Sequence, residues 1–253
     1  MRIATWNVNS VKARRERLLA FLARHRPDVV CLQELKTEEP GFPREEVLAA
    51  GYHAAVLGQK TYNGVAVLTR EEPAAVSTGF GDGGDETQAR FVAVDVAGLR
   101  VASAYVPNGQ TVGSEKWAYK LEWLARLRGW AERQAGAPLV LCGDFNVAPE
   151  DRDAANPAAW EGTVLCHEQV RAAFGRLLDL GLADAVRLHH PEGGLFTWWD
   201  YRQLAFPKND GLRIDHVLLS EALVPRCAAA RVDRDERKGK LPSDHAPVLV
   251  ELS

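Results

Sequence analysis

Short hydrophobic runs alternate with amphipathic segments along the chain. Isolated runs of strand length occupy residues 2–9, 27–34, 138–146, 212–220 and 245–252. Two further pairs of runs, 52–59 with 63–70 and 90–96 with 99–106, are separated by short connections. Apolar runs joined in this way are typical of antiparallel strand pairs. We therefore expect two strand pairs here, the second of them a hairpin that turns at Ala97-Gly98.

Three segments have the pattern of amphipathic helices. In residues 114–134, apolar side chains recur every three or four positions, at Trp117, Leu121, Leu124 and Leu127. Residues 168–181 follow the same pattern and stop at a glycine, which favours a helix C-terminus. Ser10 is a good N-cap residue, so the third helix is predicted to begin directly after it and to end before Pro27.

The order of these elements indicates an α/β protein. Strands come in pairs with helices between them, which favours two packed sheets with helices outside over a parallel series of βαβ units. The segment 231–240 has charges of both signs and is predicted to be a surface loop. Because no linker rich in Pro or Gly divides the 253 residues, we expect one domain that covers residues 1–253.

The charge balance is nearly even, with 31 Lys and Arg against 34 Asp and Glu. No global field therefore draws the protein to a polyanion, and contact with nucleic acid requires a local basic patch. Candidates for phosphate contacts are Lys12, Arg14, Arg15, Lys60, Arg90, Lys116, Lys120, Arg202 and Lys208. Four scattered cysteines predict buried thiols in a reducing compartment. Since no signal peptide or membrane-spanning run is found, we expect a soluble, cytoplasmic protein with no membrane contact.

Polar side chains stand at one end of six apolar runs. They are Asn7, Asn9, Glu34, Tyr105, Asn108, Asp144, Asn146, Asp215, Asp244 and His245. If the strands lie side by side, these residues gather at one rim and form a site. Taken singly, Asn and Asp are also common turn formers, and Asp215 is also compatible with a structural ion pair. Glu34 is harder to explain in this way because an unpaired buried carboxylate is costly.

The chemistry of this set points to a hard metal ion. It is rich in oxygen donors and has a single histidine, which suits Mg²⁺ or Mn²⁺ better than zinc. We expect metal-assisted hydrolysis of a phosphate ester, in which Asn146 holds a water molecule and Asp144 takes its proton. Asp244 and His245 are neighbours and should point to opposite faces of a strand. The carboxylate partner of His245 must then come from elsewhere, and Asp215 is the predicted partner.

Seven motifs, in order along the chain, resemble the signatures of one family. They are WNVNS (6–10), LQELK (32–36), GQKTYNGVAVL (58–68), GDFNVAP (143–149), FTWWDYR (196–202), GLRIDHVLLS (211–220) and PSDHAPV (242–248). Together they resemble the exonuclease III family of abasic-site endonucleases, within the endonuclease/exonuclease/phosphatase superfamily. The resemblance covers the whole chain, and seven motifs in register are far more specific than any one of them.

This resemblance implies a four-layer αββα sandwich of two mostly antiparallel sheets flanked by helices, as in deoxyribonuclease I. It also implies Mg²⁺-dependent cleavage of DNA phosphodiesters 5′ to abasic sites, with 3′–5′ exonuclease and 3′-end-cleaning activity. Residues at or near the metal would be Asn7, Glu34, Asp144, Asn146, Asp244 and His245. The expected partner is double-stranded DNA with abasic sites or 3′ ends, bound by a monomer associated with the nucleoid.

The resemblance also assigns catalytic roles. Tyr105 would contact the phosphate, Asp144 would activate water or protonate the leaving group, and Asn146 would steady the transition state. Asp215 would orient His245, in agreement with the pairing argument above.

Substrate contacts follow from the aromatic residues and their neighbours. Trp198 and Trp199 are adjacent and are predicted to face opposite sides, although two core tryptophans remain the alternative. By resemblance, Trp198, Leu212 and Ile214 would line a small apolar pocket for a base-free sugar. Asn9, Arg90 and Asn108 are further candidates for substrate binding.

Two other functions compete with this prediction. One is another phosphodiesterase of the superfamily, of the inositol-phosphate or sphingomyelin type, which the GLRIDH and FTWWDYR motifs disfavour. The other is a catalytically inactive DNA-binding protein. Every expected catalytic position carries the expected residue type, which disfavours the inactive protein.

Overall fold

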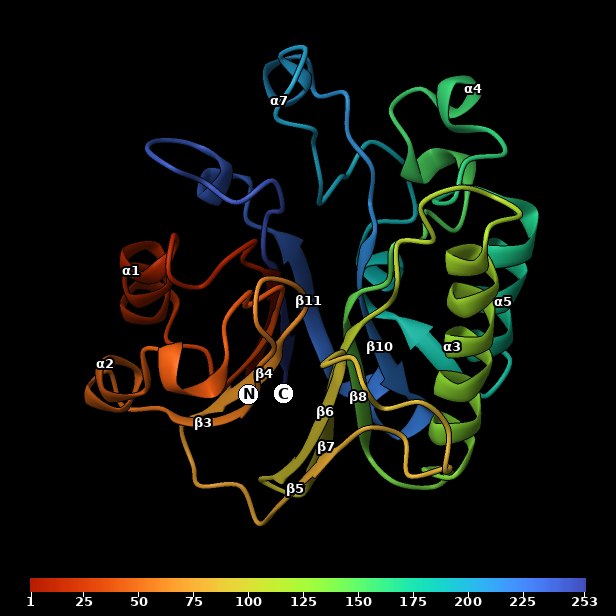
Figure 1. Cartoon of the computed structure of the whole chain (residues 1–253). Helices are drawn as coiled ribbons and strands as arrows, with labels where there is room; N and C mark the ends of the chain where they lie inside the picture. Colours follow the sequence, from red (N-terminus) through yellow and green to blue (C-terminus); the bar gives the residue numbers. More distant parts are fainter.

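The computed structural model describes residues 1–253, and two six-stranded sheets pack face to face at its centre (Figure 1). The first sheet has the order β11 (Cys227–Val232), β12 (Val248–Leu252), β1 (Arg2–Asn7), β2 (Val29–Gln33), β4 (Val65–Thr69) and β3 (His53–Leu57). The second has the order β5 (Ala75–Thr78), β6 (Phe91–Val96), β7 (Leu99–Tyr105), β8 (Leu139–Asp144), β10 (Asp215–Ser220) and β9 (Leu182–Asp184).

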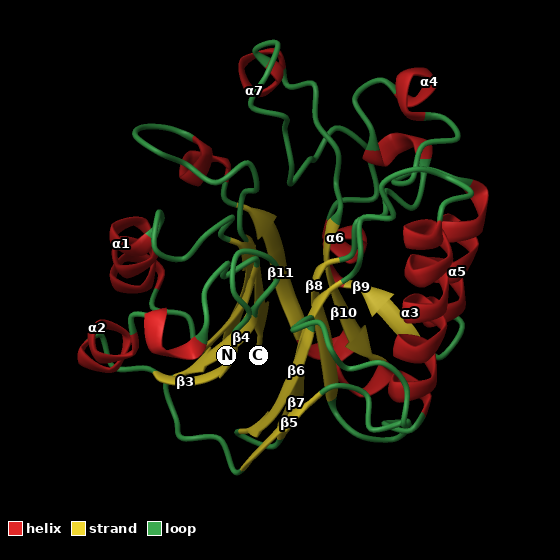
Figure 2. Cartoon of the chain, in the orientation of Figure 1, coloured by secondary structure: helices red, strands yellow, loops and turns green.

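Helices cover the outer faces of both sheets, which completes four layers (Figure 2). The first sheet is covered by α1 (Arg15–His25) and α2 (Arg44–Ala49), and the second by α3 (Glu115–Glu132) and α5 (Glu168–Leu178). Short helices make up the rest: α4 (Pro157–Trp160), α6 (Ala185–His189), α7 (Ala205–Lys208) and the 3₁₀ turns η1 (Glu39–Gly41), η2 (Asp151–Asp153), η3 (Glu221–Arg226) and η4 (Arg234–Arg237). The predicted αββα sandwich is confirmed. No helix is both long and apolar enough to cross a membrane.

Most strand pairs are antiparallel, but each sheet contains one parallel pair. In the first sheet β1 runs parallel to β2, and in the second β7 runs parallel to β8. Parallel neighbours need a crossover connection, which α1 and α3 supply. Because the carboxyl ends of both members of each pair meet at the same edge, Asn7 lies opposite Gln33, and Tyr105 lies opposite Asp144.

The space between the sheets is filled largely by β-branched side chains. Every second residue of a strand faces inward, so β1 contributes Ile3, β8 contributes Val140 and β10 contributes Val217 to one buried cluster. The same alternation places Asn7, Tyr105, Asp144 and Asp215 on the inner faces at the strand ends. The sandwich core thus continues directly into the polar rim that the sequence predicted.

The two predicted strand pairs are present. Strand β3 pairs with β4, and β6 pairs with β7 across Ala97 and Gly98, which both have positive φ, 49° and 76°. Two successive residues of positive φ are the geometry of a tight two-residue hairpin turn. Helix α3 begins as predicted, because the Ser114 side chain accepts a hydrogen bond from the Trp117 amide.

Two local predictions are wrong. Ser10 does not cap α1, because its φ is 87° and residues 11–14 form a turn before the helix begins at Arg15. The segment 231–240 is not simply a surface loop, because it completes β11 and buries two charged side chains. Glu236 is held by Arg24 at 2.6 Å, and Arg237 packs over the rings of Trp199, Tyr201 and Phe206. Each buried charge therefore has a partner that the local pattern does not reveal.

Candidate active site

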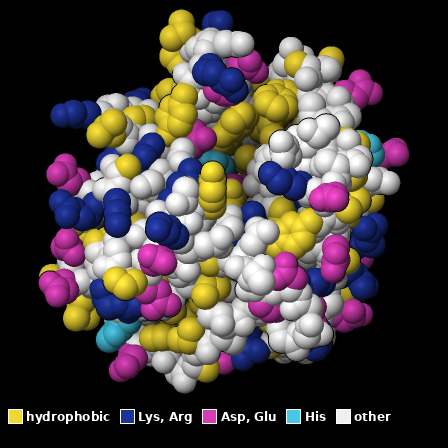
Figure 3. Space-filling model, in the orientation of Figure 1, with side chains coloured by type: hydrophobic (Ala, Val, Ile, Leu, Met, Phe, Trp, Pro, Cys, Tyr) yellow, Lys and Arg dark blue, Asp and Glu magenta, His cyan; other side chains and the backbone are white.

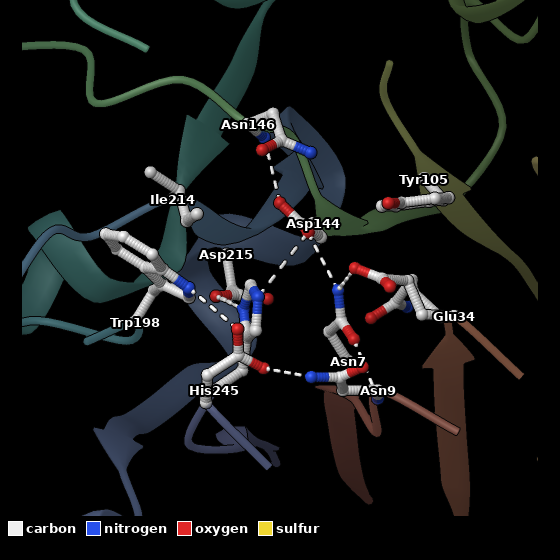
Figure 4. Close-up of polar contacts among 12 residues, drawn as sticks. Asn7, Asn9, Glu34, Tyr105, Asp144, Asn146, Trp198, Ile214, Asp215 and His245 are labelled. Atoms are coloured by element: carbon white, nitrogen blue, oxygen red, sulfur yellow. Dashed lines mark hydrogen bonds and ion pairs between the residues drawn. The ribbon is translucent and has the colours of Figure 1, made fainter. Parts of the chain in front are cut away.

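The predicted site residues lie at one edge of the sandwich and come from both sheets (Figure 4). The first sheet supplies Asn7 at the end of β1 and Glu34 just beyond β2. The second sheet supplies Tyr105, Asp144 and Asp215. Figure 3 shows a hollow on this face, where hydrophobic, acidic and histidine side chains meet with basic side chains around them. The structure therefore brings these strand ends together at one rim, as the sequence analysis predicted.

Asn7 links the carboxylates of the two sheets. Its Nδ2 donates hydrogen bonds to Glu34 Oε1 at 2.8 Å and to Asp144 Oδ2 at 2.9 Å. Its Oδ1 accepts the Asn9 amide at 3.0 Å. Glu34 reaches Asn7 because its φ is 52°, a left-handed conformation that takes the residue out of the strand alternation. The metal-ligating atom of an asparagine is its oxygen, so a role of Asn7 as a ligand stays a prediction.

Three groups form a chain from Asp215 through His245 to Asp144. His245 Nδ1 lies 2.8 Å from Asp215 Oδ2, which is the contact that the sequence predicted. His245 Nε2 lies 3.8 Å from Asp144 Oδ2. Burial alone would lower the pKa of His245, but Asp215 and Asp144 raise it to about 10. The imidazole is therefore a cation at neutral pH.

Asp144 has the opposite environment from an ordinary surface carboxylate. Burial raises its pKa to about 7, and the nearby Asp215 and Glu34 charges add to that rise while His245 opposes it. Burial also raises the pKa of Tyr105, with the charges of Glu34 and Asp144 adding to the effect. Tyr105 therefore stays a neutral hydrogen-bond donor, whereas Asp144 can exchange a proton near neutral pH.

Asp244 belongs to a neighbouring part of the site. Its two oxygens accept hydrogen bonds from Asn9 Nδ2 at 2.9 Å and from Trp198 Nε1 at 3.1 Å. Burial would raise the pKa of Asp244, but His245 and these donors lower it overall. Asp244 thus connects the predicted substrate residues Asn9 and Trp198.

Asn146 is held in a left-handed conformation with a φ of 49°. Its Nδ2 donates to Val106 O at 3.0 Å, and its Oδ1 accepts Asn108 Nδ2 at 3.2 Å. The amide of Asn146 in turn donates to Asp144 Oδ1 at 2.9 Å. Hydrogen bonds therefore connect Asp144 to Asn146, and Asn146 to the loop that carries Asn108.

Lys120 was a candidate for phosphate contact, and this prediction is wrong. Its side chain is 0% exposed and donates three hydrogen bonds to the backbone oxygens of Asn108, Asn146 and Val164, at 3.1, 2.7 and 2.7 Å. An ammonium has three donors, so all of them are used. Burial lowers the pKa of Lys120 to about 7. The residue joins three loops beneath the rim and is not available to DNA.

One group of side chains can hold a metal ion. Glu34, Asp144 and His245 each offer a ligand atom, and these atoms lie within 4.8 Å of one another. Glu34 and Asp144 are the hard oxygen donors of this group and fit Mg²⁺ or Mn²⁺, whereas His245 can act as a ligand only when its Nε2 carries no proton. In addition, the buried Asp215 Oδ1 has no hydrogen-bond partner, so the protein leaves one oxygen beside this group unsatisfied. The residues present therefore fit a divalent cation.

The apolar residues predicted to bind a sugar are also neighbours. Leu212 and Ile214 belong to one buried cluster with Leu165 and Cys166, and Trp198 packs against that cluster. Trp199 is fully buried in a different cluster, so the two tryptophans do face opposite sides. On the other flank, the Arg90 guanidinium stacks over the Tyr105 ring at 4.7 Å, and Asn108 is exposed beside it. Their roles toward a substrate stay predictions.

Three residues of the site were missed by the sequence analysis. Lys36 binds Glu34 Oε2 at 2.8 Å and the Asn9 side chain. The buried Ser243 hydroxyl donates to Asn7 O at 2.7 Å, and Trp160 packs edge-on against Trp198 at 5.8 Å. Lys36 and Ser243 lie inside the family motifs LQELK and PSDHAPV, so membership of these motifs could have identified them. Trp160 lies in a polar stretch, where nothing in the sequence marks it.

Comparison with known proteins agrees with this geometry. The model of the Endonuclease/Exonuclease/phosphatase family matches residues 4–245. The chain belongs to this family. Among its relatives, exodeoxyribonuclease III of Haemophilus influenzae is 36% identical over 100% of both chains, and an exodeoxyribonuclease of Bacillus subtilis is 32% identical over 98% of both.

Solved structures of family members are closely similar as well. The 3′ phosphatase NExo from Neisseria, bound to a product DNA hairpin, is 42% identical with a TM-score of 0.98, covering 100% of this chain and 99% of that one. An AP endonuclease from Archaeoglobus fulgidus is 37% identical with a TM-score of 0.96 over the same shares. The predicted membership of the exonuclease III family is confirmed, and the chain is a metal-dependent nuclease of that type.

Proposed function

We propose that this family member uses Mg²⁺, or Mn²⁺ in its place, to hydrolyse phosphate esters of double-stranded DNA 5′ to abasic sites and at 3′ ends. The observation that carries the proposal is the group of Glu34, Asp144 and His245, which is shared between the two sheets and in which Asp144 and His245 are buried. We further propose that residues 1–253 form a single catalytic domain that acts as a monomer on cytoplasmic DNA, in association with the nucleoid.

Incision 5′ to an abasic site, removal of a terminal nucleotide and removal of a 3′-phosphate share one step. In each case the bond between phosphorus and the 3′ oxygen breaks, water adds to phosphorus, and the product has a 3′ hydroxyl. One site can therefore perform all three reactions, and they differ only in what lies on either side of the phosphate. The names of the relatives, exodeoxyribonuclease III, 3′ phosphatase and AP endonuclease, support this common step.

The charged residues divide the work between proton transfer and charge stabilisation. His245, protonated at neutral pH, contacts a phosphate oxygen through Nε2 while Asp215 holds Nδ1. Asp144, with a pKa of about 7, accepts the proton of the attacking water, and the leaving 3′ oxygen takes up a proton from bulk water. A bound Mg²⁺, held by Glu34 with Asp144, would neutralise charge on the phosphate.

The neutral residues orient the reactants. Asn146 positions the water, because its amide group is held by Asn108 and Val106 next to the Asp144 carboxylate. The Tyr105 hydroxyl donates a hydrogen bond to a phosphate oxygen, and the stacked Arg90 guanidinium adds a positive charge on the same flank.

Selection of abasic DNA would follow from the apolar residues beside this centre. A sugar without a base has no stacking to lose when it leaves the helix, and it fits a small site where a nucleotide does not. Trp198, Leu212 and Ile214 supply such a surface, and Asn9 links to it through Asp244. Damage recognition then needs no contact with a specific base.

A gel assay with three labelled duplexes tests the proposal. They carry an abasic site, a recessed 3′ end and a 3′-phosphate, and each is incubated with Mg²⁺, Mn²⁺ or EDTA. We expect cleavage of all three with either metal and none in EDTA. Asp144→Asn should abolish every reaction, whereas Asp179→Asn, at the far end of α5, should behave like wild type. Full activity in EDTA, or hydrolysis of a phosphoinositide or sphingomyelin in place of DNA, would refute the proposal.

A further inference from the structure

Three polar side chains lie between the two sheets, in a core that is otherwise apolar. Thr5 of β1, Gln33 of β2 and Ser103 of β7 are each 0% exposed. Their inward-facing neighbours along the strands are Ile3, Cys31 and Val101. Burial of an amide and two hydroxyl groups is costly unless each finds a partner, so the three should form a closed set of hydrogen bonds.

The set is closed, and it crosses from one sheet to the other. Gln33 Nε2 donates to Thr5 Oγ1 and to Ser103 Oγ, both at 3.0 Å. The Thr5 hydroxyl donates back to Gln33 Oε1 at 3.3 Å, and the Ser103 hydroxyl donates to Leu32 O at 3.2 Å. Ser103 belongs to the second sheet and its partners to the first, so two of these bonds hold the sheets together.

This cluster, Thr5, Gln33 and Ser103, lies directly next to the candidate active site, deeper between the two sheets. Thr5 is two residues before Asn7 on the same face of β1, and Ser103 is two residues before Tyr105 on the same face of β7. Gln33 directly precedes Glu34. Each strand that enters the cluster therefore continues into a residue of the site.

The site depends on the separation of the two sheets. Glu34 comes from the first sheet and Asp144 from the second, and both must reach the same ion. Ligand distances in such sites vary by only tenths of an ångström. Apolar packing is not directional and tolerates small sliding of one sheet over the other, whereas hydrogen bonds near 3.0 Å do not. A buried hydrogen-bonded link just below the ligands is the feature that would fix their separation.

We propose that Gln33 and Ser103 are positioning residues, which hold the two sheets at the separation that lets Glu34 and Asp144 converge on one divalent cation. The inference rests on the proposed metal-dependent function and adds to it residues that touch neither metal nor DNA. Residues that orient metal ligands from behind commonly change metal affinity by ten- to a hundredfold when they are altered.

The test measures Mn²⁺ binding to metal-free protein by calorimetry, together with melting temperature and steady-state kinetics. Gln33→Met keeps the length of the side chain and removes its hydrogen bonds, and Ser103→Ala removes the acceptor on the other sheet. Val67→Ala is the matched control, because Val67 lies in the same inter-sheet core and its truncation lowers stability without touching the cluster.

We expect Gln33→Met and Ser103→Ala each to weaken Mn²⁺ binding about tenfold, with little change in KM for DNA. The double variant should be no weaker than the weaker single variant, because both changes break the same link. Val67→Ala should melt earlier yet bind Mn²⁺ like wild type. Wild-type affinity in both Gln33→Met and Ser103→Ala would overturn this inference alone. Wild-type protein that binds no Mn²⁺ would overturn the proposed function as well.

Discussion

Asp215→Asn is the substitution that most directly tests the electrostatics of the site. The carboxylate oxygen of Asp215 lies 2.8 Å from His245 Nδ1, and asparagine keeps a hydrogen-bond acceptor there while it removes the charge. The side chains of Asp215 and His245 are both buried. The variant therefore changes the charge next to His245 and leaves the shape of the site nearly as it is.

The expected size follows from the pKa of His245. It lies at about 10 instead of 6.5, although burial acts to lower it, and Asp215 is the largest influence that raises it. A rise from 6.5 to about 10 corresponds to about 5 kcal/mol in favour of the imidazolium. If Asp215 supplies half of this or more, Asp215→Asn should lower the pKa of His245 by about two units, and the imidazole becomes largely neutral above pH 8.

Two measurements check this expectation. Imidazole ¹⁵N shifts of metal-free protein report the pKa of His245 in wild type and in Asp215→Asn. Above pH 8, kinetics on the abasic duplex should show a loss in kcat/KM of about a hundredfold in Asp215→Asn and in His245→Asn, and hardly more in the double variant, because the two residues act as a unit. Asp184→Asn is the control, since it removes a buried carboxylate that pairs with Arg213. An unchanged His245 pKa, or losses that multiply, would refute the reasoning.

Further predictions concern stability and substrate choice. Trp199→Ala should cost about 3–5 kcal/mol of stability with little effect on incision, whereas Trp198→Ala should lower kcat/KM on abasic DNA about tenfold or more; melting curves and incision rates that show the reverse would contradict the assignment. In metal-free protein, the stability due to protonated His245 is complete below pH 6.5 and is lost as the pH rises toward 10. The free energy of unfolding measured in urea should therefore fall more over this range in wild type than in His245→Gln. Lys120→Met should lower the free energy of unfolding by about 3 kcal/mol or more, because three buried oxygens lose their donor, whereas exposed Lys116→Met should not; equal melting temperatures would argue against the buried role.

The sequence predicts the central strands of both sheets and the edge strand β3 well, and the other three edge strands poorly. Central strands are buried on both faces, so β2, β4 and β8 are apolar until their last residues, and β1 is buried from Ile3 onward. The three missed edge strands lack this signal. All of β5 is exposed, β9 has only three residues, and β11 is rich in alanine with partial exposure. Their pairing depends on the strand beside them, which local sequence does not encode.

The same distinction applies to the site. The inward-facing polar residues were found because a carboxylate or amide at the end of an apolar strand breaks the pattern, as in Asp144. Lys120 was misassigned because a lysine on an amphipathic helix is usually solvated, and the carbonyl oxygens that hold it come from three distant loops. Glu236 was missed for the same reason, since its partner Arg24 lies 212 residues away. Contacts of long range decide which charges are buried.

The first and last strands of the chain lie side by side at the centre of the first sheet, and this affects when the enzyme can form during synthesis. Strand β1 pairs with β12, and the marks for the two ends of the chain lie next to each other (Figure 1). The hydroxyl of Ser243, which leads into β12, donates to Asn7 O across 236 residues of sequence. While the ribosome is still producing the chain, β1 has one open edge and Asp144 and Asp215 have no histidine beside them. Only when residues 243–252 leave the exit tunnel do His245 and the last strand arrive together. A chain without residues 243–252 therefore carries most of the candidate site residues but lacks the strand and the histidine that complete the site.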